Sequence, residues 1–210
     1  MEGWETDQDG VWLVTKTGQS KRLVELKAHV DSPAHVDGQL RGLGAVHVSS
    51  LYQRDVYFAG VQGRLKLRFQ RPGRDQLVHY DREDRASTKE SQVQLSVLPP
   101  DHGLEDVLSR ALGVLVVVTK QREVFEWDGT RVHLDSVEGL GNFLEFERVV
   151  SSDAAAREAH ARLSAMLSKL GLGRDALRAG SYSDLLRSRA SGTPVGSNQR
   201  TEAPSHPAGN

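Results

Sequence analysis

The chain has 210 residues, of which 38% are hydrophobic, and this suits one domain with or without a tail. Its formal net charge of −1 gives no overall field that would recruit nucleic acid or an acidic membrane, and the absence of cysteine excludes disulfides and thiolate metal sites. No apolar run is long enough to span a bilayer or to act as a signal peptide, so we expect a cytoplasmic protein without membrane or nucleic-acid partners.

The N-terminal part of the chain starts with an acidic extension, residues 1–19. The first clear strand follows at residues 22–30, where successive side chains alternate between an apolar and a more polar face. Asp31 and Ser32, placed directly before Pro33, are typical of a helix start, so a short helix is expected after them.

Most of the remaining chain reads as alternating strands with two clear helices. The expected strands are residues 51–58, 64–69, 76–82, 93–98 and 114–125, followed by a hairpin at 131–149. The expected helices are residues 104–112 and 153–170, with shorter helical pieces near residue 175 and at 181–186. From residue 188 to 210 the chain has almost no bulky apolar side chains, so we expect a disordered tail there and a domain at residues 20–187.

The hairpin at residues 131–149 places acidic side chains on strand faces that its turn can bring together. His133 and Asp135 share one face of the first strand, and Glu145 and Glu147 share one face of the second. Converging carboxylates suit a hard divalent cation, Mg²⁺ or Mn²⁺. The alternative is a hairpin with one solvated face, which is common in antiparallel sheets.

Charged residues of one sign recur on single strand faces instead of being mixed. The basic rows are Arg64, Lys66 and Arg68 on one strand and Lys120 and Arg122 on another. Rows of like charge repel one another, so they fit a closed barrel whose lumen holds a metal-bound polyphosphate better than an open surface. About eight strands suffice to enclose one small ligand. The alternative is an open sheet with its charged face in water.

The order and spacing of eight short segments resemble the CYTH family, the triphosphate tunnel metalloenzymes, and most of all its class IV adenylate cyclase branch. The segments are residues 24–28 (VELKA), 53–58 (QRDVYF), 63–68 (GRLKLR), 79–82 (HYDR), 119–122 (TKQR), 133–141 (HLDSVEGLG), 143–147 (FLEFE) and 181–186 (SYSDLL). The resemblance implies an α+β fold, an eight-stranded antiparallel β-barrel that forms a triphosphate tunnel, with flanking helices.

The resemblance also implies roles for the charged rows. The implied metal ligands, for Mg²⁺ or Mn²⁺, are Glu25, Asp135, Glu145 and Glu147. The implied phosphate-binding residues are Lys27, Arg64, Lys66, Arg68, Arg82, Lys120 and Arg122. Lys120, Arg122 and His133 are the implied catalytic residues, while Gln53, Asp55 and Tyr57 are further lumen residues and Tyr182 receives no role.

One position departs from the family pattern. The family's first strand carries Glu-x-Glu-x-Lys, and here Leu23 stands where the first glutamate is expected. A leucine cannot bind a metal ion, so one metal site is weakened, lost or rebuilt. This departure bears on the reaction more than on the fold.

The resemblance implies an enzyme that converts ATP to cyclic AMP and diphosphate. The alternatives are a tripolyphosphatase, a thiamine triphosphatase-type hydrolase and a non-catalytic module that binds polyphosphate or nucleotides. A diphosphate ester is also a conceivable ligand, because a cationic clamp recognises phosphates and not what they carry. The expected partner is therefore a small-molecule triphosphate, bound by a monomer or homodimer.

Overall fold

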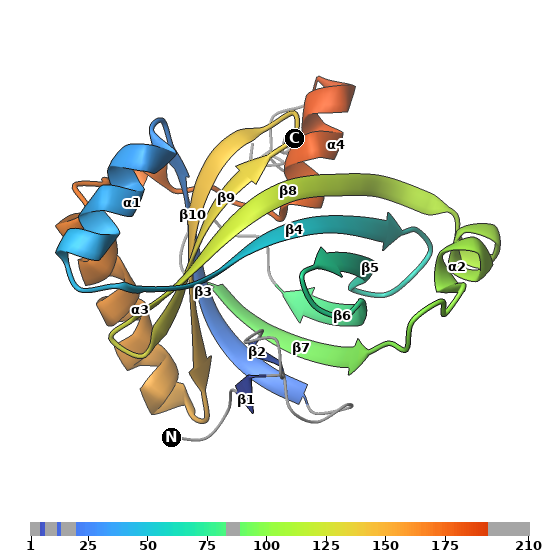
Figure 1. The fold of residues 1–210 in the computed structure, drawn as a ribbon, viewed down its shortest axis with the longest axis horizontal. Helices are drawn as coiled ribbons and strands as arrows, with labels where there is room; N and C mark the ends of the chain where they lie inside the picture. The colour runs from blue at the N-terminus through green and yellow to red at the C-terminus, as the bar shows by residue number, and fades with distance from the viewer. Residues whose placement is uncertain (1–4, 7–11, 14–19, 83–88, 193–210) are drawn as a thin grey trace, which may run out of the picture.

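The computed structural model describes residues 5–6, 12–13, 20–82 and 89–192 (Figure 1). Its strands are β1 Glu5–Thr6, β2 Trp12–Leu13, β3 Ser20–Val30, β4 Val46–Phe58, β5 Arg64–Arg71, β6 Gln76–Arg82, β7 Lys89–Val97, β8 Val114–Trp127, β9 Thr130–Val137 and β10 Gly141–Val150. Its helices are α1 Pro33–Gly42, α2 Leu104–Leu112, α3 Asp153–Lys169, the 3₁₀ turn η1 Arg174–Ala176 and α4 Tyr182–Ser191. Most of the N-terminal extension and the predicted tail beyond residue 192 lie outside the described residues.

Eight of these strands close into a single barrel, in the order β10-β3-β7-β6-β5-β4-β8-β9. Every neighbouring pair is antiparallel. The barrel with flanking helices confirms the predicted fold class. The two residues each of β1 and β2 pair with one another in a separate small sheet.

The period-two alternation of the strands places apolar side chains outside the barrel and charged side chains inside it. On β10, Leu144 and Phe146 are fully buried in a core that α1 and α3 complete, and Glu145 and Glu147 between them line the lumen. A second apolar layer lies where α2 covers β4 and β5, around Val56. Figure 1 shows α1 and α3 against one side of the barrel and α2 at the opposite side. The charged faces thus turn inward, as the like-charged rows predicted.

The helices begin where the sequence indicates. Ser32 caps α1 by accepting a hydrogen bond from the backbone N–H of His35 at 3.3 Å, and Ser152 caps α3 in the same way. Ser181 and Asp184 form a reciprocal capping box at the start of α4. Such caps satisfy backbone donors that have no partner within the helix.

Helix α4 corrects the predicted end of the domain. The tail was expected to begin at residue 188, but α4 continues to Ser191 and ends at Gly192, whose φ of +67° is the left-handed conformation that glycine adopts easily. Arg189 on the last turn donates a hydrogen bond to the carbonyl of Gly139, in the β9–β10 turn. The last turn of α4 is polar, and this contact between Arg189 and Gly139 holds it against the barrel.

Helix α4 packs against one end of the barrel through an apolar cluster. Tyr182 is buried there together with Tyr57, Val118, Val137 and Phe143. Within the part of the chain that the structure describes, no helix is both long and apolar enough to cross a membrane.

Candidate functional site: the charged lumen

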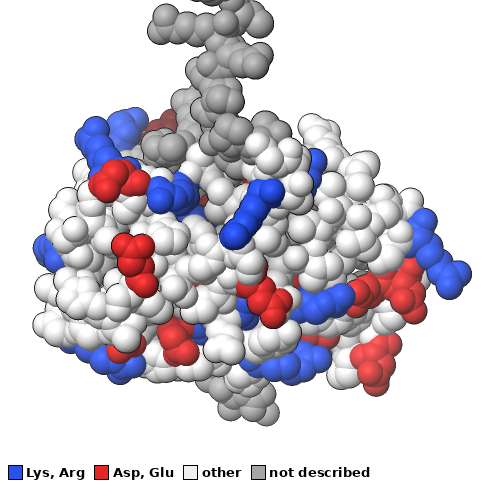
Figure 2. All heavy atoms as spheres, turned by 90° about the horizontal axis from the view of Figure 1, so that it is seen from above, with Lys and Arg blue, Asp and Glu red and all other residues white. Residues whose placement is uncertain are grey.

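The barrel encloses a cavity of about 190 Å³. Its charged lining residues come from β3, β5, β8, β9 and β10, and are Glu25, Lys27, Lys66, Arg68, Lys120, Arg122, Arg131, His133, Glu145 and Glu147. On the face of the molecule seen in Figure 2, by contrast, acidic and basic side chains are scattered over the outer surface. The face seen in Figure 2 therefore differs from the lumen, where charged side chains gather around one cavity.

The basic side of the lumen is built on β5 around a buried carboxylate. Asp55 on β4 accepts hydrogen bonds from Lys66 Nζ at 2.8 Å, and from Arg68 Nε at 2.7 Å and a second guanidinium nitrogen at 2.9 Å. Its side chain is only 2% exposed. Burial alone would raise the pKa of Asp55, but Arg68 and Lys66 hold that pKa well below its usual range. Asp55 therefore fixes two predicted phosphate-binding side chains in place as a permanent anion.

A second buried carboxylate, Asp135 on β9, organises the cations of β8. Arg122 binds it through two nitrogens, each 2.6 Å from a carboxylate oxygen, and Lys120 Nζ lies 3.5 Å away. The Tyr182 hydroxyl donates to the same carboxylate at 2.8 Å. Both oxygens are thus engaged by cations and a hydroxyl, and the predicted role of Asp135 as a metal ligand stays a prediction.

Lys27 connects the basic and acidic sides of the lumen. Its Nζ lies 3.0 Å from Glu145 Oε1 and 3.7 Å from the centre of the Tyr182 ring. Lys120 Nζ lies 4.9 Å from the same ring. A tyrosine face attracts cations, so α4 contributes to holding both lysines.

Burial weakens the protonated state of the lumen lysines. It lowers the pKa of Lys66 to about 7, with the charge of Arg68 acting in the same direction and Asp55 opposing it. It lowers the pKa of Lys120 to about 8, together with the charge of Arg122. A phosphate chain in the lumen would favour the charged forms of both lysines.

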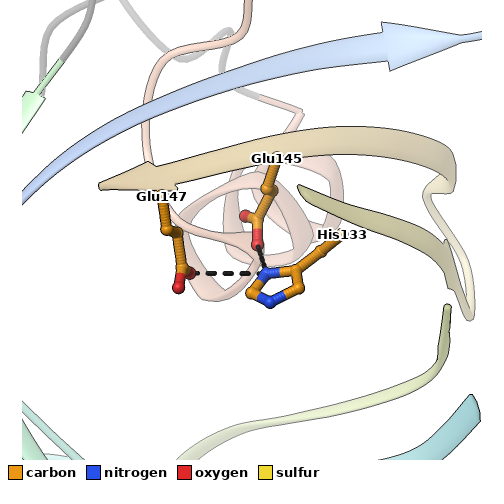
Figure 3. A group of neighbouring side chains, drawn as sticks. All are labelled: His133, Glu145 and Glu147. Carbon is orange, nitrogen blue, oxygen red and sulfur yellow. Dashed lines mark ion pairs between the residues drawn. The ribbon is translucent and has the colours of Figure 1, made fainter. Parts of the chain in front are cut away.

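The acidic side of the lumen brings His133 together with Glu145 and Glu147 (Figure 3). His133 Nδ1 lies 3.5 Å from Glu147 Oε1 and 3.9 Å from Glu145 Oε2. The three potential ligand atoms all lie within 4.8 Å of one another. This is the group of described residues in the lumen that could hold a metal ion, and the predicted role of Glu145 and Glu147 as metal ligands stays a prediction.

Both glutamates are ionised at neutral pH. Burial would raise the pKa of Glu145, but the charges of Lys27 and Arg122 hold it well below its usual range. Burial acts in the same direction on Glu147, whose pKa is nevertheless brought down to about 2 by nearby His133 and Arg122. An ionised carboxylate is the form that binds a hard cation.

The remaining predicted site residues take different places. Glu25 lines the lumen on β3, where it is the register partner of Glu147, and Leu23 lines the lumen two residues before it. Arg64 instead forms a 2.8 Å ion pair with Asp184 and connects β5 to the first turn of α4. Arg82 is the last residue of β6, and the structure does not describe its side chain.

Sequence reasoning missed the functional weight of three lumen residues. Arg131 lines the cavity as the register partner of Glu147 and could have been read from its alternation with His133. Tyr182 lies in one of the segments that resemble the family but has no predicted role, and the prediction for Asp55 was a place in the lumen without a function. Their partners lie on other strands and helices, so the alternation within one strand does not predict these contacts.

Comparison with known proteins identifies relatives of the same fold. The sequence matches the CYTH domain family over residues 21–182. A Methanocaldococcus jannaschii protein named as a candidate adenylate cyclase is 25% identical over 169 residues, which are 77% of this chain and 97% of that relative.

Solved structures agree with this match. The PH1012 protein of Pyrococcus horikoshii has a TM-score of 0.70 and 23% identity, covering 78% of this chain and 98% of that one. A Hippeastrum protein, HpAC1, named as a candidate adenylyl cyclase and described as having a dominant triphosphatase activity, has a TM-score of 0.57 and 16% identity, covering 83% and 97% of the two chains. These likenesses show the fold, and because the family match spans most of the sequence, the chain belongs to the CYTH domain family.

Proposed function

We propose that the protein is a metal-dependent enzyme that acts on a triphosphate in its lumen, and that its reaction converts ATP to cyclic AMP and diphosphate. The observation that carries the proposal is the division of the lumen. Lys66, Arg68 and Lys120 lie on one side, His133 lies with Glu145 and Glu147 on the other, and Arg122 joins the two sides through its 2.6 Å contact with Glu145. A triphosphate bound to a cation has the charges that match both sides.

The cationic side would bind and orient the phosphates. Arg68 and Arg122 are held by bidentate contacts with Asp55 and Asp135, so their guanidinium groups are fixed before a ligand arrives. Preorganised donors stabilise charge that develops in a transition state without reorganising during the reaction. Lys120 lies two residues before Arg122 on β8. Its positive charge would stabilise the negative charge that develops on the leaving phosphate.

The acidic side fits a divalent cation. Glu145 and Glu147 are ionised, and His133 presents a ring nitrogen toward both of them. When bound there, Mg²⁺ or Mn²⁺ would offset phosphate charge and polarise the phosphoryl oxygen. The chain's own contribution is to hold these three side chains together and to anchor Glu145 between Lys27 and Arg122, at 3.0 and 2.6 Å.

The choice of the cyclase reaction is supported by the name of the Methanocaldococcus jannaschii relative. The lumen also carries apolar and aromatic side chains, among them Tyr57, Tyr80, Val93 and Leu95, that could receive the organic part of a nucleotide. In this reaction the nucleophile is the 3′-hydroxyl of the substrate itself, so the clamp needs to hold ribose and phosphates in one geometry.

A triphosphate hydrolase is the second candidate. The same cationic clamp would hold tripolyphosphate or thiamine triphosphate for attack by water, and the Hippeastrum neighbour is described as having a dominant triphosphatase activity. A third candidate, a non-catalytic binding module, draws support from Leu23, which lines the lumen without any ability to bind a metal ion.

Product analysis with a panel of substrates tests the proposal. The purified full-length chain would be incubated with ATP, tripolyphosphate or thiamine triphosphate, with Mg²⁺ or Mn²⁺, and products separated by chromatography. Cyclic AMP and diphosphate in equal amounts support the cyclase. Orthophosphate without cyclic AMP supports the hydrolase, and tight binding without any product supports the binding module.

A further inference from the structure

We propose that three buried glutamines, Gln53, Gln70 and Gln76, form a neutral subsite beside the cationic side of the lumen, and that Gln53 binds the amino-bearing edge of an adenine base there. The inference rests on the proposed function, because it takes a nucleoside triphosphate as the ligand of the lumen. It deepens that function by naming the side chain that selects the organic part of the substrate.

The three glutamines lie on the wall of the lumen that β4, β5 and β6 form. Gln53 on β4 is the register partner of Gln70 on β5, and Arg68, two residues before Gln70, is the register partner of Gln76 on β6. Gln53, Gln70 and Gln76 line the cavity and are only 2%, 4% and 5% exposed. The subsite therefore borders Arg68, a predicted phosphate-binding residue, and carries no charge of its own.

The amide of Gln53 has a carbonyl oxygen without a hydrogen-bond donor. Its Nε2 donates a hydrogen bond to Gln70 Oε1 at 2.6 Å. Its Oε1 accepts no hydrogen bond from any residue that the structure describes. Buried side-chain oxygens are rarely left in this state. Because the contact with Gln70 uses one of two amide hydrogens, Gln53 keeps one acceptor and one further donor for a ligand.

The donor that this oxygen lacks has to come from the organic part of the ligand. Phosphate oxygens accept hydrogen bonds and, when ionised, donate none, so the triphosphate does not satisfy a carbonyl oxygen. Lys120 is the register partner of Gln53 on β8, but its Nζ pairs with Asp135 at 3.5 Å. An amino group on a base beside the phosphates supplies the donor.

The edge of adenine matches the amide of Gln53. Adenine offers its N6 amino group as a donor and N7 as an acceptor, and a glutamine amide can bind both at once. Guanine offers two acceptors, O6 and N7, along the same edge, so it leaves the Gln53 oxygen without a donor. Leu51, two residues before Gln53, and Leu95 on β7 line the same cavity and offer apolar surface to the faces of the base.

Binding can be measured apart from turnover with ligands that contain no cleavable phosphate bond. The full-length protein with Mn²⁺ would be titrated in a calorimeter with α,β-methylene-ADP, α,β-methylene-GDP and methylenediphosphonate. The three ligands share one diphosphonate group, and only the first two carry a base. We expect the adenine analogue to bind about tenfold or more tightly than the guanine analogue.

Two variants and a control isolate the amide. Gln53→Leu removes the acceptor and the donor, so the preference for adenine should disappear while the affinity for methylenediphosphonate stays unchanged. Gln53→Leu leaves the Gln70 oxygen buried without its donor, so the double variant Gln53→Leu/Gln70→Leu removes both partners and protects folding. Gln94→Leu is the matched control, because Gln94 is exposed on β7. It should bind all three ligands like the wild type, and circular dichroism would verify that every variant is folded.

The outcomes separate this inference from the proposed function. Equal affinity for the two nucleotide analogues, or a preference for adenine that survives in both Gln53 variants, would overturn the subsite. So would an adenine analogue that binds no more tightly than methylenediphosphonate. If adenine is preferred through Gln53 but ATP is not turned over, the subsite stands and the proposed function fails. If ATP and GTP are cyclised with equal kcat/KM, the proposed function stands and the subsite fails.

Discussion

Replacing the buried aspartate of the basic side probes how the lumen is held together. The side chain of Asp55 is 2% exposed and contacts Lys66 and Arg68 at 2.7 to 2.9 Å. Asp55→Asn preserves its size and removes its charge. The two cations that remain would then lie in the lumen without their counter-ion.

The size of the effect follows from burial. Removing one partner of a buried ion pair costs about 3–5 kcal/mol, because the other charge stays buried and unpaired. We expect the lower end, about 3 kcal/mol, because the pKa of Lys66 is already about 7 and without Asp55 this lysine releases its proton at neutral pH. For a chain of this length that loss corresponds to a fall in Tm of about 6 to 12 °C.

Urea unfolding and thermal melts would measure the loss. The matched control is Asp37→Asn, because Asp37 pairs with Arg41 on the exposed surface of α1, where one side chain is 31% and the other 53% exposed. Such an exposed i,i+4 pair contributes little to stability, because water screens both charges. Tripolyphosphate should stabilise Asp55→Asn more than the wild type, since it brings the missing negative charge. A loss no greater than that of the control would refute the idea that Asp55 is the counter-ion of the clamp.

Three further outcomes are expected. Glu147→Gln should lower metal-dependent turnover about 10²-fold or more in steady-state assays, because it removes an anionic ligand, and wild-type turnover would contradict its role. The pKa of Lys66 falls from 10.5 to about 7 on folding, so the free energy of unfolding should increase between pH 7 and 10.5. Triphosphate affinity should decrease as pH rises above 7, because Lys66 then loses its positive charge. Calorimetry should show this decrease flattened in Lys66→Arg, and an equal slope in both proteins would contradict it. Leu23→Glu should fold and bind Mn²⁺ more tightly, since Leu23 faces the lumen; an unfolded variant would show that the leucine is needed for packing.

Strong local alternation made most of the barrel predictable. Residues 64–69 alternate between basic and apolar side chains, and β5 occupies Arg64–Arg71 with Lys66 and Arg68 inside the lumen. Where a strand lacks a buried apolar face, prediction failed. The start of β4 at Val46 was missed; residues 46–50 are exposed or half-buried, so they have no fully buried apolar face like that of the rest of the strand.

The sequence predicted which charged residues line the site, but not which of them contact one another. Alternation placed Glu145 and Glu147 on one face, but only the register of β9 and β10 brings His133 opposite Glu145. Asp135 was grouped with those glutamates, and the structure engages it with Arg122 and with Tyr182, which is 47 residues away. Contacts between residues so far apart in the sequence form only when the barrel closes and α4 packs against it. The alternation within one strand predicts neither event.

The most direct test of a metal-bound triphosphate in the lumen is a crystal structure with Mn²⁺ and a non-hydrolysable triphosphate analogue. Anomalous diffraction would locate the metal independently of the protein atoms. We predict a manganese peak between His133, Glu145 and Glu147, with the phosphates against Arg68 and Arg122. A triphosphate bound only on the outer surface, or an empty lumen at saturating ligand, would contradict the account.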